Sequence, residues 1–302
     1  MTQSKSDTSS DVAISIRNLF KIFGDNPASV MPQLYDGIDK ADIQQKTGHV
    51  IGLNNINVDI QSGKITVIMG LSGSGKSTLI RHINRLIEPT AGEILLDGKN
   101  ILDLPEDKLR QLRQTRMSMV FQKFALLPHK TVLQNTMLAP MVRNEDQVKA
   151  EKEARYWLSR VELNGFEESY PHQLSGGMQQ RAGIVRALIH NPPLLMMDEP
   201  FGALDALTRE QMRIDLEELW LATKKTVLFI THSIDEAVLL ADRVVVMSPR
   251  PGTIETIIDI NMERPRGLVA RKSPEFEEAV DTITEIFLAK GVLHGGQSKT
   301  KS

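Results

Sequence analysis

The sequence predicts an α/β fold with a mixed, largely parallel core sheet. Short apolar segments, typical of buried strands, alternate with longer segments of helical periodicity between residues 65 and 247. Strands that alternate with helices favour parallel pairing, because each helix returns the chain to the same edge of the sheet. A glycine-rich turn between an apolar strand and a helix, at residues 65–80, supports the same fold class.

The region before this turn is predicted to contain a polar tail, two strands and a short helix. The tail is rich in serine and lacks the apolar residues that a packed core needs, so we expect it to be disordered. Alternating apolar residues then predict a strand, which Asn26 and Pro27 interrupt. The expected elements are the tail at 1–11, a strand at 12–23, a short helix near 40–45 and a strand at 50–60.

The remaining chain alternates between predicted helices and strands as far as residue 248. The strands are apolar runs, and the helices have apolar residues at helical spacing or a proline in the first turn. The expected order is helix 76–85, strand 92–98, helix 105–114, strand 117–121, a helical region at 126–169, a helix from 176, strand 194–197, helix 208–222 and strands 226–231 and 243–247. Pro249 and Pro251 end the pattern, so residues 249–302 are expected to form a short extension with one helix at 274–290 and a disordered tail.

Residues 70–78 form a glycine-rich loop that ends in a lysine and two hydroxyl side chains. The pattern G-x-x-x-x-G-K-[ST] lies after a strand and before a helix, as phosphate binding requires. Glycine lets backbone N–H groups approach an anion closely, and the helix dipole favours negative charge there. We therefore expect Lys76 to contact the β- and γ-phosphates of a nucleoside triphosphate and Ser77 to bind its Mg²⁺. The motif comprises Gly70, Leu71, Ser72, Gly73, Ser74, Gly75, Lys76, Ser77 and Thr78.

Several polar side chains follow predicted core strands directly. Asp198 and Glu199 follow four apolar residues, and the carboxyl ends of parallel strands meet at one edge of a sheet. We expect Asp198 to join the Mg²⁺ shell and Glu199 to polarise the attacking water. Gln122 could join the metal or water shell, and His232 could contact the γ-phosphate, although each alone is compatible with a structural role.

A second helix start with affinity for anions lies at residues 175–177. Ser175 can cap the helix, and Gly176 and Gly177 permit the close approach of an anion. The chain therefore has two such helix starts but only one loop with a lysine. Either both face one nucleotide within the chain, or one serves a nucleotide bound to a second copy; an unrelated helix cap is the third reading.

Composition narrows the classes of function. The 302 residues include 36 Lys and Arg against 38 Asp and Glu, a net charge of −2 that gives no support to bulk binding of nucleic acid. The absence of cysteine excludes disulfides and thiolate metal sites. The N-terminus lacks the apolar stretch of a secretory signal, and no apolar run reaches the ~18 residues of a membrane-spanning helix. We therefore expect a cytoplasmic protein.

The motifs together resemble those of ATP-binding subunits of ABC transporters. LSGGM at 174–178 lies between GLSGSGKST at 70–78 and LLMMDEP at 194–200, and the similarity covers residues 12–248. The resemblance implies an ABC-type P-loop NTPase core with a mixed, largely parallel sheet, an antiparallel β edge region and a helical subdomain at about 123–175. It also implies ATP and Mg²⁺ as cofactors.

The resemblance also implies roles for individual residues and a dimer. Two subunits would pair head-to-tail, so that Ser175, Gly176 and Gly177 of one close over the nucleotide of the other. The implied roles are adenine stacking for Phe23, permease sensing and metal binding for Gln122, metal binding for Ser77 and Asp198, contact between subunits for Asp205, and catalysis for Lys76, Gln122, Glu199 and His232.

Within the family, the chain is most similar to importer subunits for glycine betaine, choline and related quaternary amines. The segments NLFKIFG, VIMGLSGSGKSTLIRHINRLIEPTAGEILLDG and MVFQKFALLPHKTVLQNT carry this similarity. It implies a homodimer at the cytoplasmic face of the cell membrane, two permease subunits and an extracytoplasmic binding protein, without nucleic acid.

Other functions remain open at this stage. The segment MSPRPGTI at 247–254 and the C-terminal helix resemble those of sulfonate, taurine or nitrate importers. A soluble ABC ATPase acting on DNA or ribosomes is a second alternative, but such proteins usually carry paired cassettes or long coiled-coil inserts. A phosphotransfer kinase is a third, and it leaves the LSGG segment unexplained.

Overall fold

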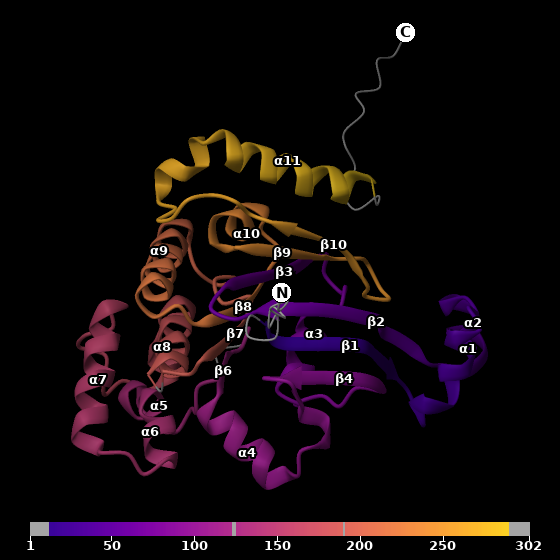
Figure 1. Cartoon of the computed structure of the whole chain (residues 1–302). Helices are drawn as coiled ribbons and strands as arrows, with labels where there is room; N and C mark the ends of the chain where they lie inside the picture. The colour runs from indigo at the N-terminus through magenta and orange to yellow at the C-terminus, as the bar shows by residue number, and fades with distance from the viewer. Residues whose placement is uncertain (1–11, 123–124, 190, 290–302) are drawn as a thin grey trace, which may run out of the picture.

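The computed structural model describes residues 12–122, 125–189 and 191–289. The predicted disordered tails at 1–11 and at the C-terminal end lie outside these residues. The described chain contains two sheets with helices around them (Figure 1). None of its helices is both long and apolar enough to cross a membrane.

The core sheet has six strands in the order β10-β9-β3-β8-β7-β6. Five neighbouring strands are parallel, and β10 pairs antiparallel with β9 at the edge. The strands are β3 (Ile65–Gly70), β6 (Met117–Val120), β7 (Leu194–Asp198), β8 (Thr226–Thr231), β9 (Arg243–Met247) and β10 (Ile254–Asp259). Every residue of β3, β7 and β8 is buried, which explains their continuous apolar sequences. The predicted mixed, largely parallel sheet is confirmed.

A second sheet of four antiparallel strands, in the order β2-β1-β4-β5, covers one side of the core. Its strands are β1 (Val12–Phe23), β2 (Val50–Gln61), β4 (Ala91–Leu96) and β5 (Lys99–Asn100). The alternating residues Ile14 and Ile16 point into a buried cluster that also contains Ile68 of β3 and Ile230 of β8. The predicted antiparallel β region is therefore present.

The two faces of the core sheet pack against different layers. On β3, the side chain of Ile68 belongs to the cluster beneath the antiparallel sheet, whereas Val67 and Met69 belong to the larger cluster beneath the helices. This alternation follows from the two-residue period of a strand. The helices of the larger cluster are α5 (Val132–Thr136), α7 (Gln147–Arg160), α8 (Gly176–Leu188), α9 (Ala206–Thr223), α10 (Ile234–Leu240) and α11 (Pro274–Ala289).

The other α-helices of the described chain lie between residues 31 and 142 of the sequence. They are α1 (Met31–Tyr35), α2 (Lys40–Thr47), α3 (Lys76–Ile83), α4 (Glu106–Thr115) and α6 (Leu138–Val142). In Figure 1, α5, α6 and α7 stand together beside α8, in the region predicted to be a helical subdomain, and α1 and α2 lie beyond the ends of β1 and β2.

Two short elements and one helix start differ from the sequence prediction. No helix was predicted at α10, because its last four residues are consecutive buried apolar side chains, and such a run has no amphipathic pattern. No strand was predicted after residue 248, yet β10 adds an edge strand whose partly exposed residues give a weak signal. Pro105 lies at the N-cap of α4 instead of in its first turn.

A buried arginine connects the C-terminal segment to the core. The guanidinium of Arg266, only 1% exposed, donates hydrogen bonds to the carbonyls of Val238 (3.0 Å), Ile260 (3.2 Å) and Met262 (2.8 Å). Its backbone N–H donates to the carboxylate of Glu217 on α9 at 2.9 Å. Burial lowers the pKa of Arg266 to about 10, so the side chain is still charged at neutral pH.

Truncating this side chain should destabilise the whole domain. Arg266→Ala leaves several buried carbonyls without their donor, and we expect the free energy of unfolding to fall by about 3 kcal/mol or more. Arg110→Ala, at an exposed position of α4, is the control and should change it by less than about 0.5 kcal/mol. Chemical denaturation measures both values, and equal stability of the two variants would contradict this role.

Candidate functional site

Residues 70–78, here called the phosphate loop, run from the last residue of β3 into the first turn of α3. Gly70 and Gly75 have φ angles of 156° and 92°, backbone conformations that residues with a Cβ rarely adopt. Lys76 is buried, and its Nζ donates to the carbonyls of Gly70 and Leu71, both at 2.8 Å. The ammonium therefore lies folded over the loop. Burial lowers the pKa of Lys76, and the negative charges of Glu199 and Asp198 oppose this shift.

A hydroxyl and a carboxylate meet beside this loop. Ser77 Oγ donates to Asp198 Oδ1 at 2.7 Å, and Asp198 is completely buried at the end of β7. Burial raises the pKa of Asp198, whereas the hydrogen bond from Ser77 and the charge of Arg81 oppose this. Two hard oxygen donors at this distance match the preference of Mg²⁺. Ser77 and Asp198 would therefore suit a Mg²⁺ ion as ligands.

The next residue, Glu199, joins two other predicted residues. Its Oε2 accepts a hydrogen bond from Gln122 Nε2 at 2.8 Å, and its Oε1 lies 3.8 Å from His232 Nδ1. Glu199 has a φ of 48°, an unusual conformation for a residue other than glycine. Gln122, Glu199 and His232 follow β6, β7 and β8, which are adjacent in the sheet. The topology thus brings together side chains that are far apart in the sequence.

Sequence reasoning did not single out Arg81. Its guanidinium lies 3.4 Å from Asp198 Oδ2, on the same carboxylate that Ser77 contacts. The signal was available, because residues four apart on a helix share one face and Arg81 follows Ser77 by four positions on α3.

The predicted site residues Ser175 and Asp205 lie at helix starts, and their side chains do not join this cluster. Ser175 caps α8, where its Oγ accepts from the N–H of Met178 at 3.3 Å. Asp205 caps α9 and accepts from Thr208 Oγ1 at 2.7 Å, and these bonds lower the pKa of the Asp205 carboxyl. Both residues thus begin helices in the described chain, as the sequence indicated for Ser175.

Phe23 lies at the end of β1, and its ring is 43% exposed. The Nζ of Lys21 lies 5.2 Å from the ring centroid, within the range of a cation–π interaction. A Cβ at Gly52 would lie only 2.6 Å from the ring, so the ring packs on a glycine of β2. A partly exposed aromatic residue held in this way is suited to stacking.

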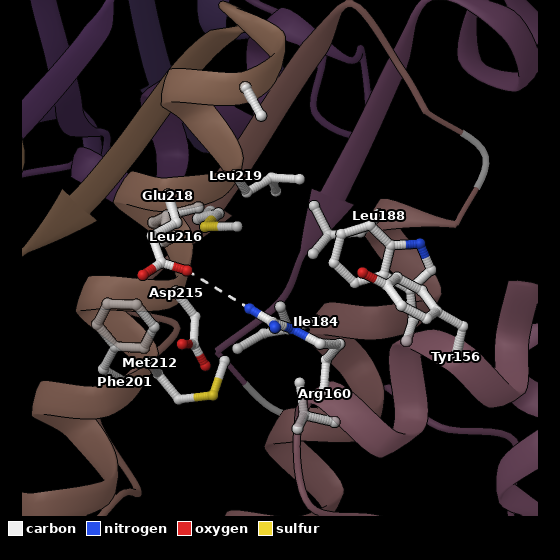
Figure 2. A pocket seen from close by; sticks show the side chains of 14 residues that line it. Tyr156, Arg160, Ile184, Leu188, Phe201, Met212, Asp215, Leu216, Glu218 and Leu219 are labelled. Atoms are coloured by element: carbon white, nitrogen blue, oxygen red, sulfur yellow. Dashed lines mark hydrogen bonds and ion pairs between the residues drawn. The ribbon is translucent and has the colours of Figure 1, made fainter.

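A separate apolar cavity of about 260 Å³ lies between α7, α8 and α9. Figure 2 shows Arg160 and Glu218 facing each other across it, with 3.4 Å between the guanidinium and the carboxylate. The lining includes Met197, the residue before Asp198, but none of the phosphate-loop residues. The cavity is therefore not part of the cluster around Lys76 and Asp198.

The family profile described as "ABC transporter" matches residues 53–202. The chain is 44% identical to the glycine betaine transport ATP-binding protein OpuAA of Bacillus subtilis, over 94% of this chain and 66% of the relative. It is 42% identical to the trimethylamine N-oxide transport system ATP-binding protein TmoW of Ruegeria pomeroyi, over 94% of this chain and 84% of the relative. The chain belongs to the ABC transporter family.

The comparisons also confirm the predicted resemblance to the glycine betaine branch. The chain is 44% identical to the glycine betaine/proline betaine transport system ATP-binding protein ProV of Escherichia coli, over 78% of this chain. It spans 66% of the length of the Bacillus relative and 59% of that of the Escherichia relative.

A solved structure, the dimeric bacterial ABC transporter cassette MJ0796, superposes with a TM-score of 0.71 at 32% identity, over 83% of this chain and all of the other. The same cassette in a post-hydrolysis state, bound to ADP and Pi, gives the same TM-score at 31% identity. The predicted ABC-type fold is confirmed.

Proposed function

We propose that this chain is the ATP-hydrolysing subunit of an ABC importer for a quaternary amine osmolyte such as glycine betaine or choline. The observation that carries the proposal is the meeting of Ser77, Asp198, Glu199 and Gln122 at the carboxyl ends of adjacent core strands. The names of the relatives support the solute class, since two of those described above concern glycine betaine and one concerns trimethylamine N-oxide.

Residues 70–78 would bind the phosphates of ATP. The loop N–H groups and the start of α3 favour an anion, and Lys76 would turn from its carbonyl partners to the β- and γ-phosphates. Ser77 and Asp198 would hold Mg²⁺, and Gln122 would offer its amide oxygen as a further ligand. When bound, the ion neutralises charge on the phosphates.

Glu199 would act on the attacking water. Its Oε1 and Oε2 lie between His232 and Gln122, so the neighbours fix the carboxylate in position. A carboxylate placed in this way can orient the water and accept its proton as the water attacks the γ-phosphate in line. His232 would contact the γ-phosphate, and Phe23 would stack on adenine.

A second copy of the chain would complete the site. Ser175, Gly176 and Gly177 begin α8, and their helix start would close over the nucleotide of the partner. Asp205, exposed at the start of α9, would contact the partner copy. The dimeric state of the related cassette supports this arrangement.

Blocking this helix start should separate binding from hydrolysis. We expect Ser175→Arg to leave MgATP binding by the isolated monomer within about twofold of the wild type, because the monomer's own phosphate loop is untouched. Hydrolysis should fall by about 100-fold or more, because one missing transition-state donor already costs about 10²–10³. Ser159→Arg, on α7, is the control, and normal hydrolysis by Ser175→Arg would contradict the cross-subunit site.

The proposed partners are two permease subunits and an extracytoplasmic substrate-binding protein that acts through them. The chain would then bind peripherally at the cytoplasmic face of the cell membrane. Closing and opening of the dimer with nucleotide would move the permease. The solute would be recognised in the permease and the binding protein, where aromatic rings favour a quaternary ammonium group.

Co-purification from a membrane extract tests the assembly. With this chain as bait, we expect two permease copies and an ATPase activity that the Glu199→Gln chain does not give. Recovery of ribosomes or DNA without a membrane partner would contradict the importer and favour a soluble ABC ATPase.

A further inference from the structure

Residues 248–253, which connect β9 to β10, lie directly against the phosphate loop. A Cβ built on Gly252 would lie 2.1 Å from the carbonyl oxygen of Ser74, closer than real Cβ atoms approach any heavy atom. At the end of β9, a Cβ on Gly70 would lie 2.7 Å from the carbonyl oxygen of Met247. The phosphate loop thus contacts the segment 248–253 at Gly252 and the end of β9 at Met247, in both cases at a backbone carbonyl.

The segment 248–253 is fixed by its own hydrogen bonds. Ser248 Oγ donates to the carbonyl of Pro251 at 3.1 Å and accepts from the N–H of Thr253 at 3.0 Å. The hydroxyls of Ser248 and Thr253 also lie 2.8 Å apart. One hydroxyl therefore closes the loop across five residues and holds Gly252 in place.

The same segment is tied to two other elements. Gly252 N–H donates to the carbonyl of Gly52 at 2.9 Å, and the Gly252 carbonyl accepts from the N–H of Asn54 at 2.9 Å, so Gly252 joins the edge of β2. The Nζ of Lys40 on α2 donates to the carbonyl of Arg250 at 2.8 Å. This bond links α2 to the segment 248–253.

The phosphate loop is therefore supported on one side and open on the other. Leu53 of β2 would lie 2.6 Å from a Cβ on Gly75, so β2 supports the end of the loop as Gly252 supports its middle. Ser74 is completely buried on the supported side. Gly73, in contrast, is exposed, and a Cβ there would meet no described atom within 4 Å.

We propose that Gly252 is a positioning residue for ATP binding, which holds the Ser74 peptide so that the loop N–H groups converge on phosphate. The inference rests on the proposed function, because it assumes that residues 70–78 bind the phosphates of ATP. A side chain at position 252 would meet the Ser74 carbonyl first, and this backbone group cannot rotate aside. Met247 Cε at 2.9 Å and Leu53 Cδ2 at 3.1 Å would crowd the added Cβ from other directions. The phosphate loop then loses its alignment while the strands remain paired.

The test compares Gly252→Ala with Gly267→Ala in the full chain. At Gly267 a Cβ would meet no described atom within 4 Å, and its φ of −66° suits alanine. We expect Gly252→Ala to raise the Kd of MgATP and the KM for ATP about tenfold or more, with a smaller change in kcat. Gly267→Ala should stay within about twofold of the wild type in all three. Titration of a fluorescent ATP analogue and steady-state hydrolysis measure these values.

Three outcomes would overturn the inference, each at a different step. A wild-type chain that does not bind MgATP removes the proposed function and this inference with it. A Gly252→Ala chain that binds as tightly as a binding-competent wild type removes the positioning role alone. If Gly252→Ala does not fold, Ser248→Ala takes its place in the test. This variant loosens segment 248–253 without a clash and should raise the Kd of MgATP about threefold. An unchanged Kd would remove the positioning role.

Discussion

Replacement of Glu199 by glutamine is expected to slow ATP hydrolysis by about 10²–10⁴-fold, the usual contribution of a positioned general base. The variant should still bind MgATP, because the proposed contacts of Lys76 and Ser77 with the phosphates and the metal do not involve Glu199. Glutamine preserves the size of the side chain and can still pair with Gln122, but it cannot accept a proton. A nucleotide-bound dimer should therefore accumulate, which size-exclusion chromatography with ATP detects.

Glu278→Gln, at an exposed position of α11, is the matched control for this charge change. It should hydrolyse ATP at the wild-type rate, as a phosphate-release assay measures. Undiminished hydrolysis by Glu199→Gln would remove Glu199 from its catalytic role.

Replacement of Lys76 by alanine is expected to weaken MgATP binding by about 100-fold or more, because truncating one partner of a buried charge contact costs about 2–5 kcal/mol. Lys76 is the buried cation of the phosphate loop, and its Nζ already lies over Gly70 and Leu71. Burial lowers the pKa of Lys76, so its ammonium loses its proton at a lower pH than that of an exposed lysine. As it does so, the affinity for ATP should fall, as it does on replacement by alanine.

Lys108→Ala, at an exposed position of α4, controls for the loss of a lysine and should bind MgATP as the wild type does. Isothermal titration calorimetry gives both affinities. Tight binding by Lys76→Ala would show that the phosphate loop does not depend on this cation.

The apolar pattern was sufficient to predict the core sheet and the cluster at the carboxyl ends of its strands, and the resemblance to ABC transporters added the antiparallel region. Residues 65–70, 194–198 and 226–231 are continuous apolar runs, and such runs indicate buried parallel strands whatever their neighbours. Once these strands are adjacent, the residues that follow them meet without further information. This explains why Gln122, Glu199 and His232 could be grouped before the structure was known.

Contacts that depend on neighbouring strands could not be predicted. Gly252 lies beside Ser74 only because β9 pairs with β3, and no periodicity in the sequence encodes this contact. The edge strand β10 and the buried helix α10 lack an alternating or amphipathic pattern, so local reasoning had no signal for them. The roles of Ser175 and Asp205 require a second subunit and remain predictions.

Uptake into proteoliposomes tests the central claim most directly. The chain is reconstituted with its permease and with the binding protein outside, and ATP is enclosed with the chain. We predict uptake of radiolabelled glycine betaine or choline that requires ATP and is absent with the Glu199→Gln chain. Transport of taurine or nitrate in their place, or uptake that is the same without ATP hydrolysis, would contradict the account.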